Sequence, residues 1–189
     1  MDAFSQLQLA EPIVSTRGAK YCALSNGTAK FIHTVGSREA PLTSPFGASS
    51  FGDEATTTHK TIEFRLPPTW VDYFDAFDSW AVTYITCHSE RLFGKPLTID
   101  QVRDSYKPCV TRRGNYQPTL RCKLNIPGTS AVRCWNPLEQ RMGVPDDFRG
   151  YEMVPRVSAL HLWIMNREFG FVFQVNDLMC SEVSQSCPF

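Results

Sequence analysis

One long helical pattern, set among strand patterns, limits how this chain can fold more than any other feature. From Trp70 to His88 the apolar side chains recur at spacings of four and three residues, which places them on one helical face. Pro67-Pro68 precedes the pattern, and Thr69 has the residue type of an N-cap. We predict a helix over 69–91 that ends near Gly94.

Part of this segment also fits a strand, because Trp80 to Cys87 is rich in Val, Thr and Ile. A second short helix is expected over 98–104. Strand patterns surround the helices and include a hairpin at Asn26-Gly27, a strand over 61–66, an alternating strand over 119–126 and a long hairpin over 156–180. Short strands with one inserted helix favour a small barrel or sandwich, so the predicted class is mainly β with one inserted α-helix and long loops.

The length of 189 residues predicts a single domain, 1–189, with flexible ends at about 1–18 and 181–189. Residues 36–58 are rich in Gly, Ser, Thr, Ala and Pro and predict a long exposed loop. A content of 42% hydrophobic and 20% charged residues excludes general disorder. No run of about 18 apolar residues occurs, so no membrane association is expected.

The seven cysteines are widely spaced and no secretory signal precedes them, which favours a reduced intracellular compartment. Cys109, Cys122 and Cys134 include no pair at the close spacing of a structural zinc site. Asp72, Asp75 and Asp78 could hold a cation, but their spacing more simply gives a polar helix face. We therefore predict no metal, no cofactor and no catalytic residues, although a site assembled from distant residues stays open.

The zero net charge conceals a strongly basic segment. Between residues 103 and 133 there are seven cations and one anion, so this segment carries +6 and the remainder −6. Arg121 and Lys123 share one face of the predicted strand, opposite its apolar face. Cations can contact phosphates and exposed aromatic rings can stack on bases, which is the combination that a single-strand groove needs. A solvated strand face is the simpler alternative.

We assign the segment two kinds of candidate side chain. The predicted phosphate contacts are Lys107, Arg112, Arg113, Arg121, Lys123 and Arg133. The predicted base-stacking residues are Tyr106, Tyr116 and Trp135.

Two stretches resemble a known family. They are YKPCVTRRGNYQPTLRCKLNI at 106–126 and LWIMNREFGFVFQV at 162–175. They are similar to the OB-fold single-stranded DNA-binding proteins of phage T7 type and of large eukaryotic DNA viruses, and the order of elements agrees over 60–180. The positions that carry this resemblance are Pro108, Arg112-Arg113, Tyr116-Gln117-Pro118, Lys123, Trp163 and Phe169-Gly170.

The resemblance implies an OB-like β-barrel and a sequence-tolerant single-stranded DNA-binding protein, without enzymatic activity, that acts in DNA replication, recombination or repair. It places the protein inside the cell, in the nucleus or at a viral replication site, or in the cytoplasm if viral or phage. Family members commonly end in an acidic tail with a terminal aromatic residue that contacts replication proteins. Phe189 fits this pattern, but Glu182 is the one acid among the last nine residues.

A second hypothesis is a β-rich structural or protein-interaction module whose basic segment meets an acidic partner. The sequence leaves the choice between DNA and RNA open, because it depends on contacts to the 2′-hydroxyl. It also leaves a homo-oligomer open.

Overall fold

A computed structural model describes residues 4–16, 18–27, 29–50, 59–126 and 128–183. The chain is mainly β. Its helices are α1 (Pro68–Cys87), α2 (Ser89–Phe93) and α3 (Ile99–Ser105). Its strands are β1 (Leu7–Leu9), β2 (Ile13–Val14), β3 (Lys20–Asn26), β4 (Ala29–Lys30), β5 (Ile32–Thr34), β6 (Ala48–Ser49), β7 (His59–Arg65), β8 (Tyr106–Lys107), β9 (Val110–Thr111), β10 (Thr119–Asn125), β11 (Arg133–Trp135), β12 (Arg141–Met142), β13 (Tyr151–Met165) and β14 (Glu168–Glu182).

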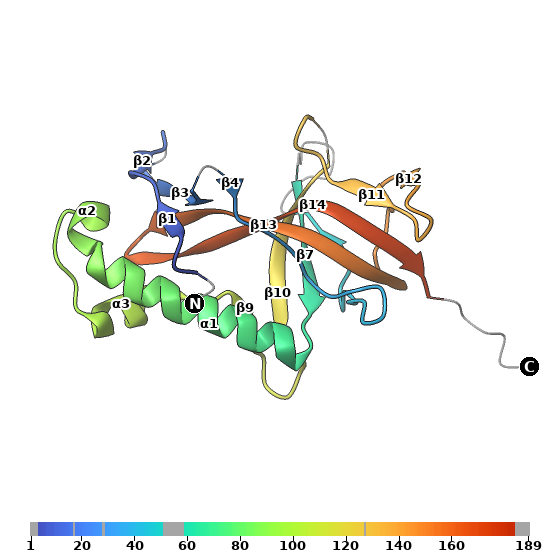
Figure 1. Cartoon of the computed structure of the whole chain (residues 1–189), viewed down its shortest axis with the longest axis horizontal. Helices are drawn as coiled ribbons and strands as arrows, with labels where there is room; N and C mark the ends of the chain where they lie inside the picture. The colour runs from blue at the N-terminus through green and yellow to red at the C-terminus, as the bar shows by residue number, and fades with distance from the viewer. Residues whose placement is uncertain (1–3, 17, 28, 51–58, 127, 184–189) are drawn as a thin grey trace, which may run out of the picture.

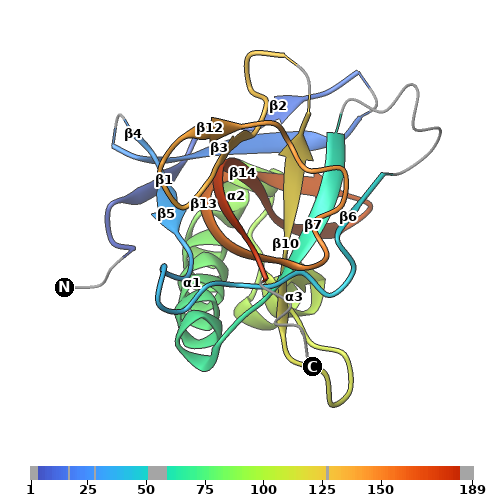
Figure 2. The ribbon, with the colours of Figure 1, turned by 90° about the vertical axis from the view of Figure 1, so that its right-hand side faces the viewer.

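The strands form one curved sheet in the order β1-β3-β13-β14-β10-β7-β6. In the described residues its first and last strands do not pair with each other, so the sheet is not closed. The β13–β14 hairpin runs the length of the molecule, with α1 alongside it (Figure 1). From the end, α1 and α3 lie below strands β3 and β13 (Figure 2). None of the described helices combines the length and apolar character that crossing a membrane requires.

The main helix begins and ends earlier than the sequence predicts. Pro67, rather than Thr69, is its N-cap, and no side chain caps it. Pro68 can occupy the first helical position because its fixed φ suits a helix and its missing N–H needs no partner there. The helix breaks at His88, and α2 then continues to Gly94, whose φ of 77° ends it as predicted. The predicted short helix is confirmed as α3, and the strand alternative for Trp80–Cys87 is wrong.

The terminal hairpin is longer than predicted, with 15 residues in each strand. Its two-residue turn is Asn166-Arg167, and both residues have positive φ, 52° and 67°. A two-residue turn with both φ values positive matches the right-handed twist of the flanking strands. The two strands pair from this turn to the other end of the hairpin. The register of the pairing shifts at two places.

The sheet has two chemically different faces. On β14, Phe171 and Phe173 lie against α1, where Phe77 and Phe74 contact them at ring-centroid distances of 4.9 Å and 5.4 Å. Because side chains alternate along a strand, Val172 faces the opposite side. We call the side that α1 covers the inner face and the other the outer face.

Part of the N-terminal segment predicted to be flexible at 1–18 packs on the body of the protein, whereas Ile13 and Val14 are largely exposed. Phe4 is buried against Phe77, with ring centroids 5.6 Å apart, and β1 pairs with β3. Leu42, in the predicted exposed loop 36–58, is also buried and exchanges two backbone hydrogen bonds of 2.7 Å with Met153. A single apolar residue in a polar segment can dock by such distant contacts, which local composition does not reveal. Residues 51–58 and Phe189 lie outside the described residues.

Candidate nucleic-acid interface

The outer face carries a groove of about 700 Å³ where β8, β10, β13 and β14 meet. We call it the central groove. Cationic and aromatic side chains line it together, namely Lys107, Arg121 and Lys123 with Tyr21, His161 and Trp163.

Strand alternation places the cations on this face. Leu120, Cys122 and Leu124 of β10 are almost completely buried, so Arg121 and Lys123 between them face outward. The predicted alternation of β10 is thus confirmed. Among the described residues, Lys123 makes no ion pair.

Trp163 lines the groove, and its neighbour across the strands is a glycine. Gly170 pairs with Trp163 on β13 and with Lys107 on β8. A Cβ atom at Gly170 would lie 3.0 Å from the carbonyl oxygen of Lys107 and 3.4 Å from the Trp163 ring. The missing side chain therefore lets the indole and the β8 backbone approach β14 closely.

Lys107 stands at the edge of the groove and is already paired. Its Nζ lies 2.6 Å from Oε1 of Glu168, and both side chains are about half exposed. This ion pair is accessible to water, so a phosphate can compete for the ammonium group.

His161 and Tyr21 complete the aromatic side of the groove. Their rings meet edge to face with centroids 4.9 Å apart. Burial, and then the charge of Lys123, lower the pKa of His161 below its ordinary value. The imidazole is therefore neutral near pH 7 and presents an aromatic ring beside the cations.

A second hollow of about 530 Å³ adjoins the central groove, and Thr111 lines both. We call it the end pocket. Phe46, Arg65, Arg113, Asn115 and Tyr116 are among the residues that line it. The β9–β10 loop that carries Tyr116 projects from the body of the molecule (Figure 1).

The predicted arginines of this loop are held by carboxylates from other elements. Arg112 donates to both carboxylate oxygens of Asp75 at 2.8 Å and 2.6 Å. Arg113 donates to both oxygens of Glu63 at 3.2 Å and 3.1 Å. Arg113 thus reaches the end pocket, whereas Arg112 lines neither hollow.

Tyr106 was predicted to stack on bases, but the structure buries it. Its hydroxyl donates a 2.6 Å hydrogen bond to Asp78 of α1, and only 7% of the residue is exposed. Burial raises the pKa of Tyr106 well above its ordinary value. Burial also raises the pKa of Asp78, against the hydrogen bonds from Cys109 and Tyr106. Tyr106 therefore anchors β8 to α1 and offers no ring face to a ligand.

Arg133 and Trp135 lie apart from the central groove, on β11. Both bind Asp177, with Arg133 Nε 2.7 Å from Oδ1 and the Trp135 Nε1 donating at 3.2 Å. Arg141 lies over the Trp135 ring at 5.5 Å. Strand β11 sits at the end of the β13–β14 hairpin away from α2 (Figure 1). The predicted set is thus divided between the central groove, the end pocket and β11, while Arg112 lines neither hollow and Tyr106 is buried.

Tyr21, Phe46, His161 and Trp163 line the two hollows but were not assigned as contacts from the sequence. The sequence motifs include Trp163 without giving it a contact, and they do not include His161. The signal for both was the position of fully buried Leu162 between them, which implies that its neighbours face the other way. No sequence pattern around Phe46 indicates that it lines a binding site.

Within the described part of the chain, no group of three or more His, Cys, Asp or Glu side chains is placed to hold a metal ion. The cations and aromatic rings that line the central groove suit binding to an anionic ligand with flat groups.

The fold is similar to that of gp2.5, a single-stranded DNA-binding protein encoded by bacteriophage T7. The two structures agree with a TM-score of 0.55 at 14% sequence identity, over 85% of this chain and 91% of that one. The single-stranded DNA-binding protein of bacteriophage Enc34, solved with single-stranded DNA, gives a TM-score of only 0.42 at 8% identity, over 96% of this chain and 95% of that one.

No protein-family model matches the sequence, and no curated protein matches it. The similarity to gp2.5 therefore concerns the fold. At that level it confirms the resemblance to proteins of phage T7 type that the sequence motifs indicated.

Proposed function

We propose that this protein binds single-stranded DNA with little sequence preference and is not an enzyme. One observation carries the proposal: Lys107, Arg121 and Lys123 line one groove together with the rings of Tyr21, His161 and Trp163. A single strand exposes both phosphates and base faces, so it can use both kinds of side chain at once. A duplex hides its base faces and cannot.

The shared fold with gp2.5 supports the same proposal. We also propose that the curved sheet is an OB-like barrel and that residues 1–189 form one nucleic-acid-binding domain. A role in DNA replication, recombination or repair follows from single-strand binding. Contacts of Phe189 with replication proteins, and a homo-oligomer, stay predictions.

The test is a fluorescence titration of a labelled dT oligonucleotide, with a matched duplex and a matched RNA strand as controls. We expect the single strand to bind more tightly than the duplex, with an affinity that falls as salt rises. The RNA control decides whether the 2′-hydroxyl is tolerated.

The Trp163→Ala variant tests the site itself. It should weaken binding by about 1–3 kcal/mol, the value of one base–aromatic stack. Leu138→Ala is a matched control, because Leu138 is 76% exposed and lines neither hollow. Absence of binding at low salt, or equal affinity for duplex and single strand, would refute the proposal and favour a protein-interaction module.

A further inference from the structure

Two large aromatic side chains on the end pocket are largely exposed. Phe46 is 65% exposed and Tyr116 is 82% exposed. They belong to different segments, the chain before β6 and the β9–β10 loop, yet both line the same hollow. Exposed aromatic residues that gather at one hollow indicate a binding site.

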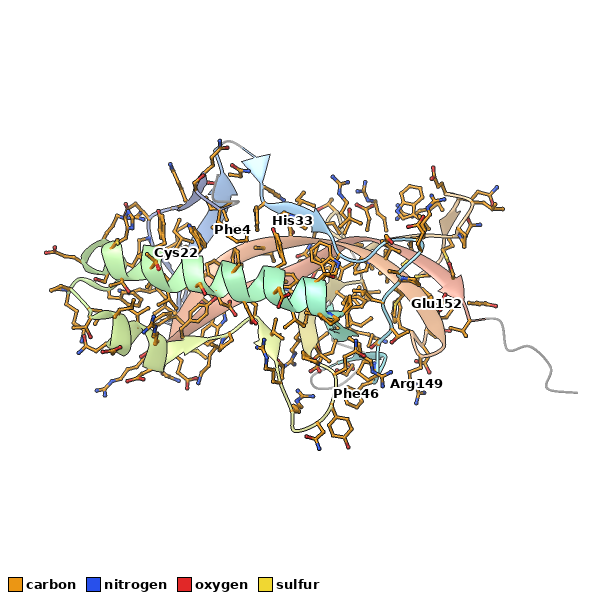
Figure 3. The ribbon with its side chains drawn as sticks, turned by 60° about the horizontal axis from the view of Figure 1, so that its bottom comes forward. Phe4, Cys22, His33, Phe46, Arg149 and Glu152 are labelled. Carbon is orange, nitrogen blue, oxygen red and sulfur yellow. The ribbon has the colours of Figure 1, made fainter. Side chains whose placement is uncertain are left out.

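The turn that presents Phe46 is fixed from within. Ser44 is buried, and its hydroxyl donates to the carbonyl oxygen of Gly47 at 3.3 Å. Gly47 has a φ of 67°, and a Cβ atom there would lie 2.9 Å from Oδ1 of Asp147. The positive φ therefore favours glycine at this position. Figure 3 shows Phe46 on the outside of the molecule, next to the labelled Arg149.

The loop that presents Tyr116 is fixed independently. The side-chain amide nitrogen Nε2 of Gln117 donates to the carbonyl oxygen of Leu66 at 3.0 Å. The backbone N–H of Leu66 donates to Pro118 at 2.8 Å, and that of Tyr116 donates to Arg113 at 3.1 Å. Both rings are thus presented by anchored segments, so a ligand between them would find much of its site already formed.

The end pocket also has a cation. Arg65 is exposed, and within the described parts of the chain it makes no ion pair, whereas Arg113 is held by Glu63. Arg65 pairs across the strands with Thr119 of β10, which places it on the same face as Arg121 and Lys123. Along this face Glu63, which pairs across the strands with Arg121, lies before Arg65, and its carboxylate is bound by Arg113.

We propose that the end pocket holds one unstacked nucleobase of the bound strand against the rings of Phe46 and Tyr116, with an adjacent phosphate on Arg65. The proposal rests on the proposed function and extends it to a separate base-binding subsite. The volume of about 530 Å³ lies within the range of pockets that take small planar ligands. The pocket and the central groove share Thr111, so one strand can occupy both.

The experiment uses the full chain and the shortest dT oligonucleotide that binds at full affinity, which limits sliding. One abasic residue is placed at each position in turn. The wild-type protein should lose about 5- to 100-fold in affinity at a position that corresponds to the pocket. Phe46→Ala and Tyr116→Ala should lower the affinity for the intact oligonucleotide by a similar factor. For these variants, an abasic residue at that position should cause little further loss of affinity.

Leu138→Ala again serves as the control for loss of an exposed apolar side chain, and it should retain the wild-type abasic profile. Thermal melts should confirm that the exposed substitutions leave the fold intact. If Phe46→Ala and Tyr116→Ala keep both wild-type affinity and the wild-type abasic profile, the subsite does not exist. That result differs from failure of the proposed function, in which the wild-type protein itself would not bind the oligonucleotide.

Discussion

Replacing Lys123 with alanine should make single-strand binding less sensitive to salt by an amount that follows from the charges on the outer face. Among the described residues, five basic side chains line the two hollows, namely Arg65, Lys107, Arg113, Arg121 and Lys123. Each phosphate contact on a single strand contributes about −0.7 to the slope of log affinity against log salt, so one contact per cation gives about −3.5. Loss of the Lys123 contact should reduce this to about −2.8.

Between about 50 mM and 200 mM salt, these slopes correspond to a loss of about 130-fold for the wild type and about 50-fold for Lys123→Ala. The assay is a fluorescence titration of a dT oligonucleotide at four or more salt concentrations. Lys95→Ala is the matched control, because Lys95 is exposed and lines neither hollow. A Lys123→Ala slope equal to that of the wild type, or an equal reduction for Lys95→Ala, would show that the central groove does not contact phosphates.

Three further predictions follow from groups in or beside the groove. Glu168→Gln should raise affinity by about 1.5- to 5-fold in the same titration, because it releases Lys107 from an exposed ion pair. Binding should tighten as the pH falls below the ordinary pKa of histidine, and His161→Gln should abolish that gain, because the pKa of free His161 lies below its ordinary value and a bound phosphate favours its cationic form. Tyr106→Phe should lower the free energy of unfolding by about 1–3 kcal/mol in a denaturant titration, because the hydrogen bond from the hydroxyl to Asp78 is lost. The salt slope of binding should stay unchanged. An altered salt slope with normal stability would contradict this.

The fold could be predicted from sequence wherever a local period was strong. The alternation of Leu120, Cys122 and Leu124 gave both the strand and its buried face correctly. The helical period of α1 predicted the helix, and Phe74, Phe77 and Ala81 of the predicted face are among its buried residues, together with Val82 and Ile85. In each case the same few residues determine the conformation and the side that faces the core.

The predictions on the site were less successful because its electrostatics depend on distant partners. The basic segment has a net charge of +6 when its residues are counted. In the structure, four of its seven cations form ion pairs with Asp75, Glu63, Glu168 and Asp177. All four carboxylates come from outside the segment, so no local sum of charges reveals them. Tyr106 was assigned wrongly for the same reason, since its partner in α1 is 28 residues away.

The position of β14 in the sheet has a consequence for the order in which the molecule can be built. This strand pairs with β13, β10, β11 and β8, and its pairings with the last three are parallel. Of the described elements it is also the last to be synthesised. During synthesis on the ribosome, the edges of β8, β10 and β11 that pair with β14 therefore stay unpaired until residues 168–182 have emerged. Parallel pairing that forms late and over a long sequence distance is slow. Chains that stop before β14 should therefore be retained by chaperones or aggregate rather than form a smaller folded protein.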